Sequence, residues 1–479
     1  MNGGAPVSQL KKVLIANRGE IAVRIVRACA EMGIRSVAIY TEPDRYALHV
    51  KRADEAHSLG EDPIAGYLDP SAIVNLAAQT GCDAIHPGYG FLSENARFAY
   101  LCEQKGIKFI GPKSSVIERM GDKTAARASM RAAGVPVTPG SDGNLASIED
   151  AKQVAAQIGY PVMIKATSGG GGRGIRRVDN EKELEQQFPR VISEATKAFG
   201  SADVFLEKCI INPRHIEVQI LADSQGSVVH LYERDCSIQR RNQKLIEIAP
   251  SPQLTPEQRE YIGGLAVKAA EAVGYENAGT VEFLLTGNEV YFMEMNTRVQ
   301  VEHTITEQIT GVDIVREQLR VAAGLPLSFR QQDISYRGFA LQFRINAEDP
   351  QNDFLPSFGR VSHYYAPGGP GVRVDTAIYT GYDIPPYYDS MCLKLVVWAL
   401  NWEEAIARGE RALDDMHLQG IRTTAPYYRQ ILGNEDFRSG QFDTSFVPSH
   451  PELLKYSNKR QPGDIALAIA AAVAAHAGW

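Results

Sequence analysis

Short apolar runs alternate with helix-like stretches through the first 111 residues, and this alternation restricts the fold more than any other feature of the sequence. The runs KVLIA at 12–16 and SVAIY at 36–40 flank the stretch 20–31, whose apolar positions recur at helical spacing. Two more runs follow at 82–85 and 107–110. Strands that alternate with helices of about 10–15 residues form βαβ units with a parallel sheet. We therefore predict an N-terminal parallel α/β domain over residues 1–111.

The chain then changes character twice. After a connecting helical segment at 112–136, residues 137–208 predict a small α+β lid domain. In this domain Ser147 with Asp150 has the pattern of a capping box that opens a helix. Residues 209–456 are rich in strand-like runs and predict a larger, mixed, β-rich C-terminal domain.

A linker and a C-terminal helix are predicted for the end of the chain, at 457–479. Asp464 is placed to cap this helix, and Ile465, Ile469 and Val473 recur every four residues as one apolar stripe. We expect the stripe to be buried, either against its own domain or against a partner subunit. The sequence favours neither alternative.

Composition excludes several classes of protein. The net charge of −7 argues against a general nucleic-acid-binding protein. Six scattered cysteines without a CxxC pair are typical of reduced thiols, and they favour neither a disulfide framework nor a zinc site. The N-terminus lacks the apolar core of a secretory signal, and the longest apolar run, 465–475, is shorter than the roughly 20 residues that span a bilayer. We expect a cytoplasmic protein without a membrane partner.

A glycine-rich loop, SGGGGRG at 168–174, is the first stretch that indicates chemistry. It matches GxGxxG formally, but the strand-like run 175–178 follows it, whereas a dinucleotide site requires a helix there. The pattern favours a flexible hairpin whose backbone N–H groups close over phosphates, with a solvent-exposed turn as the alternative. Lys165 just before the loop supplies a cation, and Lys123 is a second candidate outside any Walker A motif.

Acidic residues interrupt two apolar strands of a predicted hairpin at 280–295. Glu282 and Glu294 would share one face of this hairpin, and Asn296 adds an amide oxygen. Two like charges on a half-buried face are costly unless a cation joins them. This set of oxygen ligands suits Mg²⁺ or Mn²⁺, and the alternative is a pair of solvent-facing glutamates.

The next residues alternate in a way that predicts an oxyanion site. In an extended chain Arg298, Gln300 and Glu302 would point to one side, so that a guanidinium, an amide and a carboxylate converge as a cradle with a base. His303 would point away and is interpreted as structural. A basic run at 233–244, with Arg344 at a strand end, suits an enzyme that handles ATP and another anion.

Taken together, these stretches resemble the biotin carboxylase family of the ATP-grasp superfamily. The resemblance covers about residues 11–450 and is carried, in the expected order, by nine motifs: IANRGEIAVRI (15–25), HPGYGFLSEN (86–95), GDK (121–123), KATSGGGGRG (165–174), NPRHIE (212–217), ERDCSIQRR (233–241), EMNTRVQVEH (294–303), RINAEDP (344–350) and PPYYDSM (385–391). It implies an α/β ATP-grasp enzyme with the domains outlined above.

The resemblance also implies roles for individual residues. Arg298, Gln300, the Val301 N–H and Lys244 would hold bicarbonate, and Glu302 would be its general base. Two Mg²⁺ or Mn²⁺ ions would be held by Glu282, Glu294 and Asn296. The residues expected around ATP are Lys123, Lys165, Gly169, Gly170, Gly171, Gly172, Gly174, Glu207, Lys208, Ile210, His215, Gln239, Asn242 and Leu284.

The implied reaction is the carboxylation of biotin through carboxyphosphate, with Arg344 stabilising the biotin enolate. Asn242 departs from the histidine that the family commonly has there. Since no Met-Lys dipeptide occurs, the biotinyl and carboxyltransferase domains are expected on another chain. The segment RRNQKLIEIAPSPQLT and the C-terminal tail resemble the biotin carboxylase subunit of two-subunit pyruvate carboxylases. An acyl-CoA carboxylase subunit is the alternative, and we expect a homodimer or a larger assembly.

Two other interpretations compete with this one, the first close to it and the second from a different functional class. Another ATP-grasp ligase would use the same metals to activate a different carboxylate, and bicarbonate-dependent ADP release with biotin separates the two. A non-catalytic nucleotide sensor is disfavoured because Glu302, Arg344 and the metal acids are all present. The glycine-rich module at 137–208 is expected to act as a lid over the nucleotide.

Overall fold

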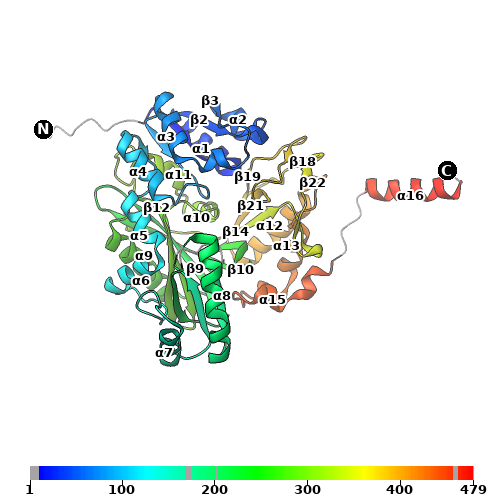
Figure 1. Cartoon of the computed structure of the whole chain (residues 1–479). Helices are drawn as coiled ribbons and strands as arrows, with labels where there is room; N and C mark the ends of the chain where they lie inside the picture. Colours follow the sequence, from blue (N-terminus) through cyan, green and yellow to red (C-terminus); the bar gives the residue numbers. More distant parts are fainter. Residues whose placement is uncertain (1–9, 168–173, 201, 457–461, 478–479) are drawn as a thin grey trace.

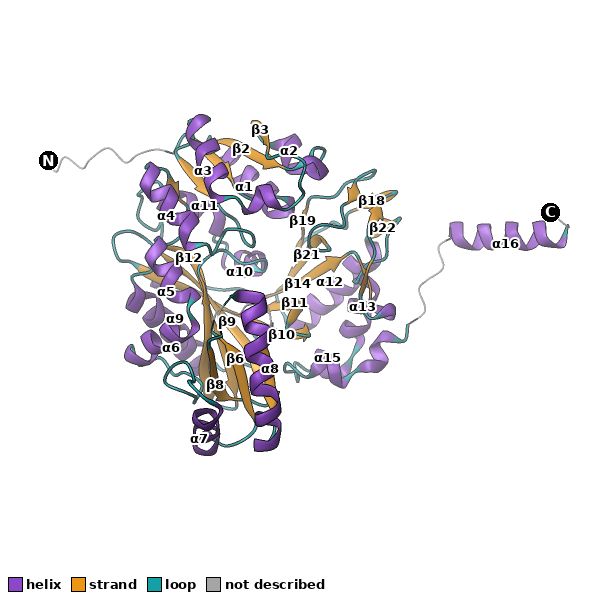
Figure 2. Ribbon diagram, in the orientation of Figure 1, coloured by secondary structure: helices purple, strands orange, loops and turns teal. Residues whose placement is uncertain are grey.

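The computed structural model describes residues 10–167, 174–200, 202–456 and 462–477. The three largest sheets, of five, three and eight strands, each pack against their own helices (Figures 1 and 2). Among the described residues, none of the helices is both long and apolar enough to cross a membrane.

The N-terminal part is the predicted parallel sheet, with strand order β3-β2-β1-β4-β5. Successive side chains of β1 point to opposite faces: Val13 and Ile15 pack with helix α1, while Leu14 packs with α3 and α4. Helices therefore cover both faces, as a parallel sheet requires. The elements are β1 (Lys12–Ile15), α1 (Gly19–Glu31), β2 (Arg35–Tyr40), α2 (Leu48–Arg52), β3 (Glu55–Ser58), α3 (Pro70–Gln79), β4 (Ala84–His86), α4 (Ala96–Lys105) and β5 (Lys108–Phe109).

A three-stranded antiparallel sheet of order β7-β6-β8 follows two connecting helices. Ser147 is the N-cap of its first helix, because its Oγ accepts a hydrogen bond of 3.1 Å from the Asp150 N–H. The helices α7 and α8 pack on one face of this sheet. The elements are α5 (Ser114–Gly121), α6 (Lys123–Ala132), α7 (Ile148–Ile158), β6 (Val162–Ala166), β7 (Ile175–Val178), α8 (Glu181–Phe199) and β8 (Val204–Lys208).

An eight-stranded antiparallel sheet of order β13-β12-β9-β10-β11-β14-β21-β19 forms the largest part. Alternation along β12 sends Val281 and Phe283 into the core under α9 and turns Glu282 to the opposite face. The elements are β9 (Arg214–Ala222), β10 (Val228–Arg240), β11 (Gln243–Ala249), α9 (Pro256–Val273), β12 (Asn277–Thr286), β13 (Glu289–Asn296), α10 (His303–Thr310), α11 (Ile314–Ala322), β14 (Phe339–Asn346), β19 (Val372–Thr376) and β21 (Met391–Ala399).

Small ribbons and helices complete this part of the chain. Apolar side chains of α12 and α13 pack with β14 and β21 in the largest core cluster. The elements are β15 (Glu348–Asp349), β16 (Leu355–Pro356), β17 (Gly359–Arg360), β18 (His363–Tyr365), β20 (Asp383–Ile384), α12 (Trp402–Asp415), β22 (His417–Gln419), α13 (Ala425–Gly433), α14 (Glu435–Arg438) and α15 (Phe446–Ser449).

The last helix, α16 (Pro462–His476), stands apart from the rest of the molecule (Figure 1). It begins two residues before Asp464, so the prediction that Asp464 caps it is wrong: a proline suits the first turn of a helix, where its missing N–H costs nothing. Ile469 and Val473 are exposed, so for these two residues of the stripe packing against the rest of the chain is not found.

Candidate functional site

A cavity of 1140 Å³ opens where the three sheets meet. The turn after β1 and the turn after β4 reach it from the parallel sheet, at the carboxyl ends of the strands. Gly169 to Gly172 lie outside the described residues. Gly174, just before β7, has a φ of +70°, and its carbonyl accepts from the N–H of Ala166 at the end of β6. All other residues predicted for the site line the cavity: Lys123, Lys165, Glu207, Lys208, Ile210, His215, Gln239, Asn242, Lys244, Glu282, Leu284, Glu294, Asn296, Arg298, Gln300, Val301, Glu302 and Arg344.

The acidic hairpin forms one wall of the cavity. Glu282 and Glu294 are direct partners in the register of β12 and β13. Glu282 is buried, so the alternative of two solvent-facing glutamates does not hold for it. Burial, and then the charge of Glu282, raise the pKa of Glu294, against the effect of Lys123. Two facing carboxylates of this kind attract a cation.

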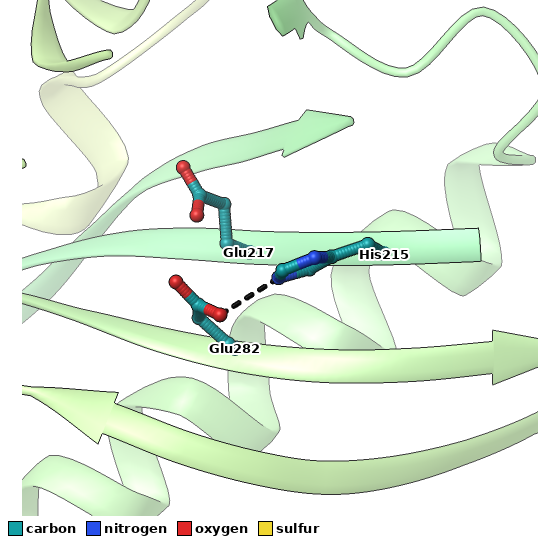
Figure 3. A group of neighbouring side chains, drawn as sticks. All are labelled: His215, Glu217 and Glu282. Atoms are coloured by element: carbon teal, nitrogen blue, oxygen red, sulfur yellow. Dashed lines mark hydrogen bonds and ion pairs between the residues drawn. The ribbon is translucent and has the colours of Figure 1, made fainter. Parts of the chain in front are cut away.

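Glu282 is already surrounded by donors. Its Oε2 lies 2.7 Å from His215 Nε2 (Figure 3). Its Oε1 accepts from Lys244 Nζ at 3.0 Å, from Asn296 Nδ2 at 2.9 Å and from Gln300 Nε2 at 2.7 Å. Burial alone would raise the pKa of Glu282, but Lys244 and His215 hold it well below its ordinary value.

The residues present fit a divalent cation. Ligand atoms of His215, Glu217 and Glu282 all lie within 4.8 Å of one another. Among the predicted metal ligands, Asn296 turns its Nδ2 toward Glu282, and its Oδ1 accepts from Arg298 at 3.0 Å. This amide must therefore rotate to offer its oxygen to a metal ion. Carboxylate and amide oxygens are hard ligands of the kind that Mg²⁺ prefers.

The predicted base, Glu302, lies at the centre of a buried group of charges. Its carboxylate accepts from Lys244 Nζ at 2.7 Å and from Arg344 Nη2 at 3.0 Å. Burial by itself would raise the pKa of Glu302, yet Lys244 and then Arg344 and Arg234 hold it well below its ordinary value. The side chain is therefore an ionised carboxylate at neutral pH.

One expectation for this segment is wrong. Residues 298–302 are not extended, because the chain turns there and Glu302 becomes the N-cap residue of α10 with φ −86° and ψ 9°. The guanidinium of Arg298 forms an ion pair with a distant residue, since its Nε donates to Glu94 at 2.9 Å, across 204 residues of sequence. Arg298, Gln300 and Glu302 still line one cavity, because tertiary contacts and not strand alternation orient them.

Lys244 and Arg344 are the cations that donate to the Glu302 carboxylate. Lys244 Nζ donates to Glu217, Glu282 and Glu302 together, and although burial lowers the pKa of Lys244, these carboxylates hold it well above its ordinary value. Arg344 donates its Nε to Glu247 and its Nη2 to Glu302. Both cations are therefore fully charged and aimed into the cavity, where an anionic substrate is attracted.

Three buried charged residues of this group were not predicted from the sequence. Glu217 and Glu247 interrupt apolar strands, HIEVQILA in β9 and LIEIA in β11, which is the same signal that identified Glu282. Arg234 is fully buried. Its guanidinium donates to five side chains: Glu217, Gln219, Thr280, Gln300 and Thr306.

The end of the cavity beside the sheet β7-β6-β8 carries further cations. Lys165 of β6 forms an ion pair with Glu207 of β8, which also accepts from Arg127 at 2.8 Å. Burial lowers the pKa of Lys123. The ammonium of Lys208, which also lines the cavity, donates to the carbonyls of Gly159 and Tyr160, both at 2.9 Å.

Asn242 lies at the turn between β10 and β11, at the edge of the cavity. Its φ is +65°, in the left-handed region that asparagine tolerates better than most residues. The departure from histidine at this position therefore suits the turn. Other lining residues come from the motifs 15–25, 86–95 and 385–391, to which no individual role was assigned from the sequence: Asn17, Arg18, Glu20, Tyr89, Tyr388 and Asp389.

Three family models match the chain. They are described as biotin carboxylase, N-terminal domain, at residues 9–117; carbamoyl-phosphate synthase L chain, ATP binding domain, at 122–330; and biotin carboxylase C-terminal domain, at 342–449. Together they cover most of the sequence in the order expected from its motifs.

Individual proteins are similar over nearly the whole length. The chain is 55% identical over 470 residues to the 2-oxoglutarate carboxylase small subunit of Hydrogenobacter thermophilus, covering 98% of this chain and 99% of that one. It is 54% identical to a pyruvate carboxylase subunit of Methanothermobacter thermautotrophicus, covering 92% and 90%. A crystal structure of the biotin carboxylase domain dimer of the Hydrogenobacter enzyme, with MgADP, ADP and bicarbonate, aligns with a TM-score of 0.92 at 55% identity, covering 94% of this chain and all of that one.

Proposed function

This chain belongs to the biotin carboxylase family and has its ATP-grasp fold, and on that premise we propose that it carboxylates biotin with ATP and bicarbonate. One observation carries the proposal: the buried carboxylate of Glu302 is held ionised between Lys244 and Arg344 inside the cavity. The ionised carboxylate is free to accept a proton, and the same cations attract a small anion and favour its deprotonated form.

The first half of the reaction activates bicarbonate. Arg298, Gln300, Lys244 and the Val301 N–H hold the anion, and Glu302 takes its proton. The resulting dianion attacks the γ-phosphorus of ATP, so that the bond to ADP breaks and carboxyphosphate forms. When bound, Mg²⁺ or Mn²⁺ neutralises charge on the phosphates, and Glu282, Glu294 and Asn296 are the residues to hold it.

The second half transfers the carboxyl group. Carboxyphosphate decomposes to CO₂ and phosphate, and the phosphate takes the proton from N1′ of biotin. The nitrogen then attacks CO₂ while the guanidinium of Arg344 stabilises the negative charge on the ureido oxygen. Arg344 suits this role because it lines the cavity, where Glu247 holds its Nε and Glu302 accepts from its Nη2.

The biotin is proposed to arrive on another chain that also carries the carboxyltransferase. No Met-Lys dipeptide is present to accept biotin. We propose pyruvate as the final acceptor, giving oxaloacetate, with an acyl-CoA as the alternative. The similarity to a 2-oxoglutarate carboxylase subunit supports a second 2-oxo acid as acceptor equally well. In this scheme the acceptor never enters the cavity, so the partner chain decides it.

ADP release tests the proposal most directly. The purified chain is assayed with MgATP and free biotin, with and without bicarbonate, and we expect ADP release to depend on bicarbonate. Free biotin is expected to be a poor substrate, because it lacks the effective concentration that a tethered carrier supplies. Release that is the same without bicarbonate would indicate another ATP-grasp ligase.

The acceptor is tested on the complex with its partner. The chain is purified together with the biotin-bearing subunit that co-purifies with it, and fixation of ¹⁴C-bicarbonate is measured with pyruvate, 2-oxoglutarate, acetyl-CoA or propionyl-CoA. Acid-stable label with pyruvate supports the proposal. Label with another acceptor alone would refute the pyruvate assignment and leave the biotin carboxylase function intact.

A further inference from the structure

The turn that joins β13 to α10 contains a backbone N–H that is left free of protein acceptors in the described part of the chain. Val301 lines the cavity, and among the described residues its N–H has no protein acceptor. The carbonyls on either side of Val301 are both occupied. Gln300 O lies 2.7 Å from His303 Nδ1 and also accepts from the His303 backbone N–H at 3.3 Å, and Val301 O accepts from Lys394 Nζ at 3.0 Å.

The imidazole of His303 has one possible protonation state in this contact. A carbonyl oxygen only accepts, so Nδ1 must carry the proton. Burial, and then the charges of Lys394 and Arg24, hold the pKa of His303 well below its ordinary value, so the ring is neutral. Its Nε2 is buried without a hydrogen-bond partner among the described residues. Among the described residues, the ring therefore forms a hydrogen bond only with the Gln300 carbonyl.

Lys394 links this turn to the parallel sheet. The side chain comes from β21 and is fully buried. Its ammonium lies 3.0 Å from Glu20 Oε2 at the start of α1, and the other oxygen of Glu20 accepts from the Tyr89 hydroxyl. One ammonium thus joins the β1–α1 segment, strand β21 and the turn of the proposed base.

Because the peptide group is planar, these contacts fix the direction in which the Val301 N–H points. In a trans peptide the C=O and the following N–H point to opposite sides. A donor that holds Gln300 O on the protein side therefore turns the Val301 N–H toward the cavity. A donor that holds Val301 O fixes the next peptide, from which the Glu302 side chain extends.

We propose that His303 and Lys394 are positioning residues, which orient the Val301 N–H toward bicarbonate and set the place of the Glu302 carboxylate. This inference rests on the proposed function and deepens it, because it explains how the turn is held ready before substrate arrives. It adds a positioning role to the structural one expected for His303: the ring touches no substrate, yet it helps to hold the carbonyl opposite the bicarbonate donor.

Two amide substitutions at position 303 test the role of the histidine. In His303→Asn the amide nitrogen can take the place of Nδ1 and keep the donor to Gln300 O, whereas in His303→Gln the amide reaches the place of Nε2 instead. We expect the KM for bicarbonate to stay near wild type in H303N and to rise at least about tenfold in H303Q, since misplacement of a binding group by about 1 Å costs up to about 10²-fold. The KM for ATP is expected to stay unchanged in both.

Lys394→Met tests the second contact, since methionine keeps the length of the side chain and loses the donor. We expect a lower kcat with an unchanged KM for ATP, and partial recovery in Lys394→Arg. Lys108→Met, which removes an ion pair with Glu276 outside the cavity, is the matched control. Thermal denaturation of each variant confirms that it is folded.

The outcomes separate this inference from the function on which it rests. A wild-type chain without bicarbonate-dependent ADP release would defeat the proposed function. If the wild type is active and H303N and H303Q show the same KM for bicarbonate, the positioning role of His303 is refuted. If K394M raises the KM values for ATP and bicarbonate alike, Lys394 stabilises the fold without directing the turn.

Discussion

Replacing Glu302 by glutamine removes one negative charge from the centre of the cavity and keeps the shape of the side chain. The two cations that contact Glu302 retain other carboxylates: Lys244 keeps Glu217 and Glu282, and Arg344 keeps Glu247. Because neither cation is left alone, we expect the free energy of unfolding to fall by less than the about 3–5 kcal/mol that an orphaned buried charge costs.

The expected effect on turnover is much larger than the effect on stability. The glutamine cannot accept the proton of bicarbonate, and removal of a general base costs about 10²–10⁴-fold in rate. A loss of about 10²-fold corresponds to about 2.7 kcal/mol of activation free energy at 25 °C. Affinity for ADP should not change, because the nucleotide is expected to lie beside other residues of the cavity.

Three measurements check this prediction. Bicarbonate-dependent ADP release gives turnover, calorimetric titration gives ADP affinity, and chemical denaturation gives the free energy of unfolding. Glu276→Gln is the matched control, because Glu276 is buried and paired with Lys108 at 2.7 Å but does not line the cavity. Near-normal turnover in E302Q would remove Glu302 from the role of base. A stability loss as large as that of a lone buried charge would refute the electrostatic argument.

Three further predictions concern pH, metal and partner. Because the pKa of Glu302 is lower in the folded than in the unfolded chain, its ionised form stabilises the fold at pH values above the unfolded pKa of about 4.3. This stabilisation is lost as the pH falls from there toward the folded pKa. In denaturation series below about pH 4.3, the difference in unfolding free energy between wild type and E302Q should therefore narrow. Glu294→Gln removes a proposed ligand and should raise the Mg²⁺ concentration for half-maximal ADP release about tenfold or more; an unchanged requirement would exclude Glu294 as a ligand. Deletion of 463–479 should leave free-biotin activity intact. It should weaken co-purification with the biotin-bearing subunit, because it removes the exposed Ile469 and Val473, which are expected to contact that subunit. Equal recovery of the partner would refute docking through α16.

Local sequence patterns predicted much of the fold. The alternation at 12–40 produced β1, α1 and β2, and Ser147 caps α7 as its position indicated. The facing pair Glu282 and Glu294 could also be predicted, because the side chains of a hairpin are related by a short turn and a period of two. Each of these features depends on residues close together in the chain, so a short window contains all the information.

The environment of the proposed base could not be predicted in the same way. Strand alternation placed Arg298 beside Glu302, but the chain turns at that point and Arg298 pairs with Glu94. The residues that do hold Glu302 come from β11 and β14, 58 and 42 positions away. No local pattern connects residues at such separations.

The sequence by itself determined which kinds of side chain are available: paired acids, a basic run and motifs of a known family. Only the tertiary structure decided their partners. An acid such as Glu217 or Glu247 interrupts an apolar strand in the same way whether its face meets solvent or a buried cavity. The charge state of Glu302 and the direction of the Val301 N–H depend on Lys244, Arg344, His303 and Lys394. Burial and opposite charge act through space, so they exist only once the sheets have packed around the cavity.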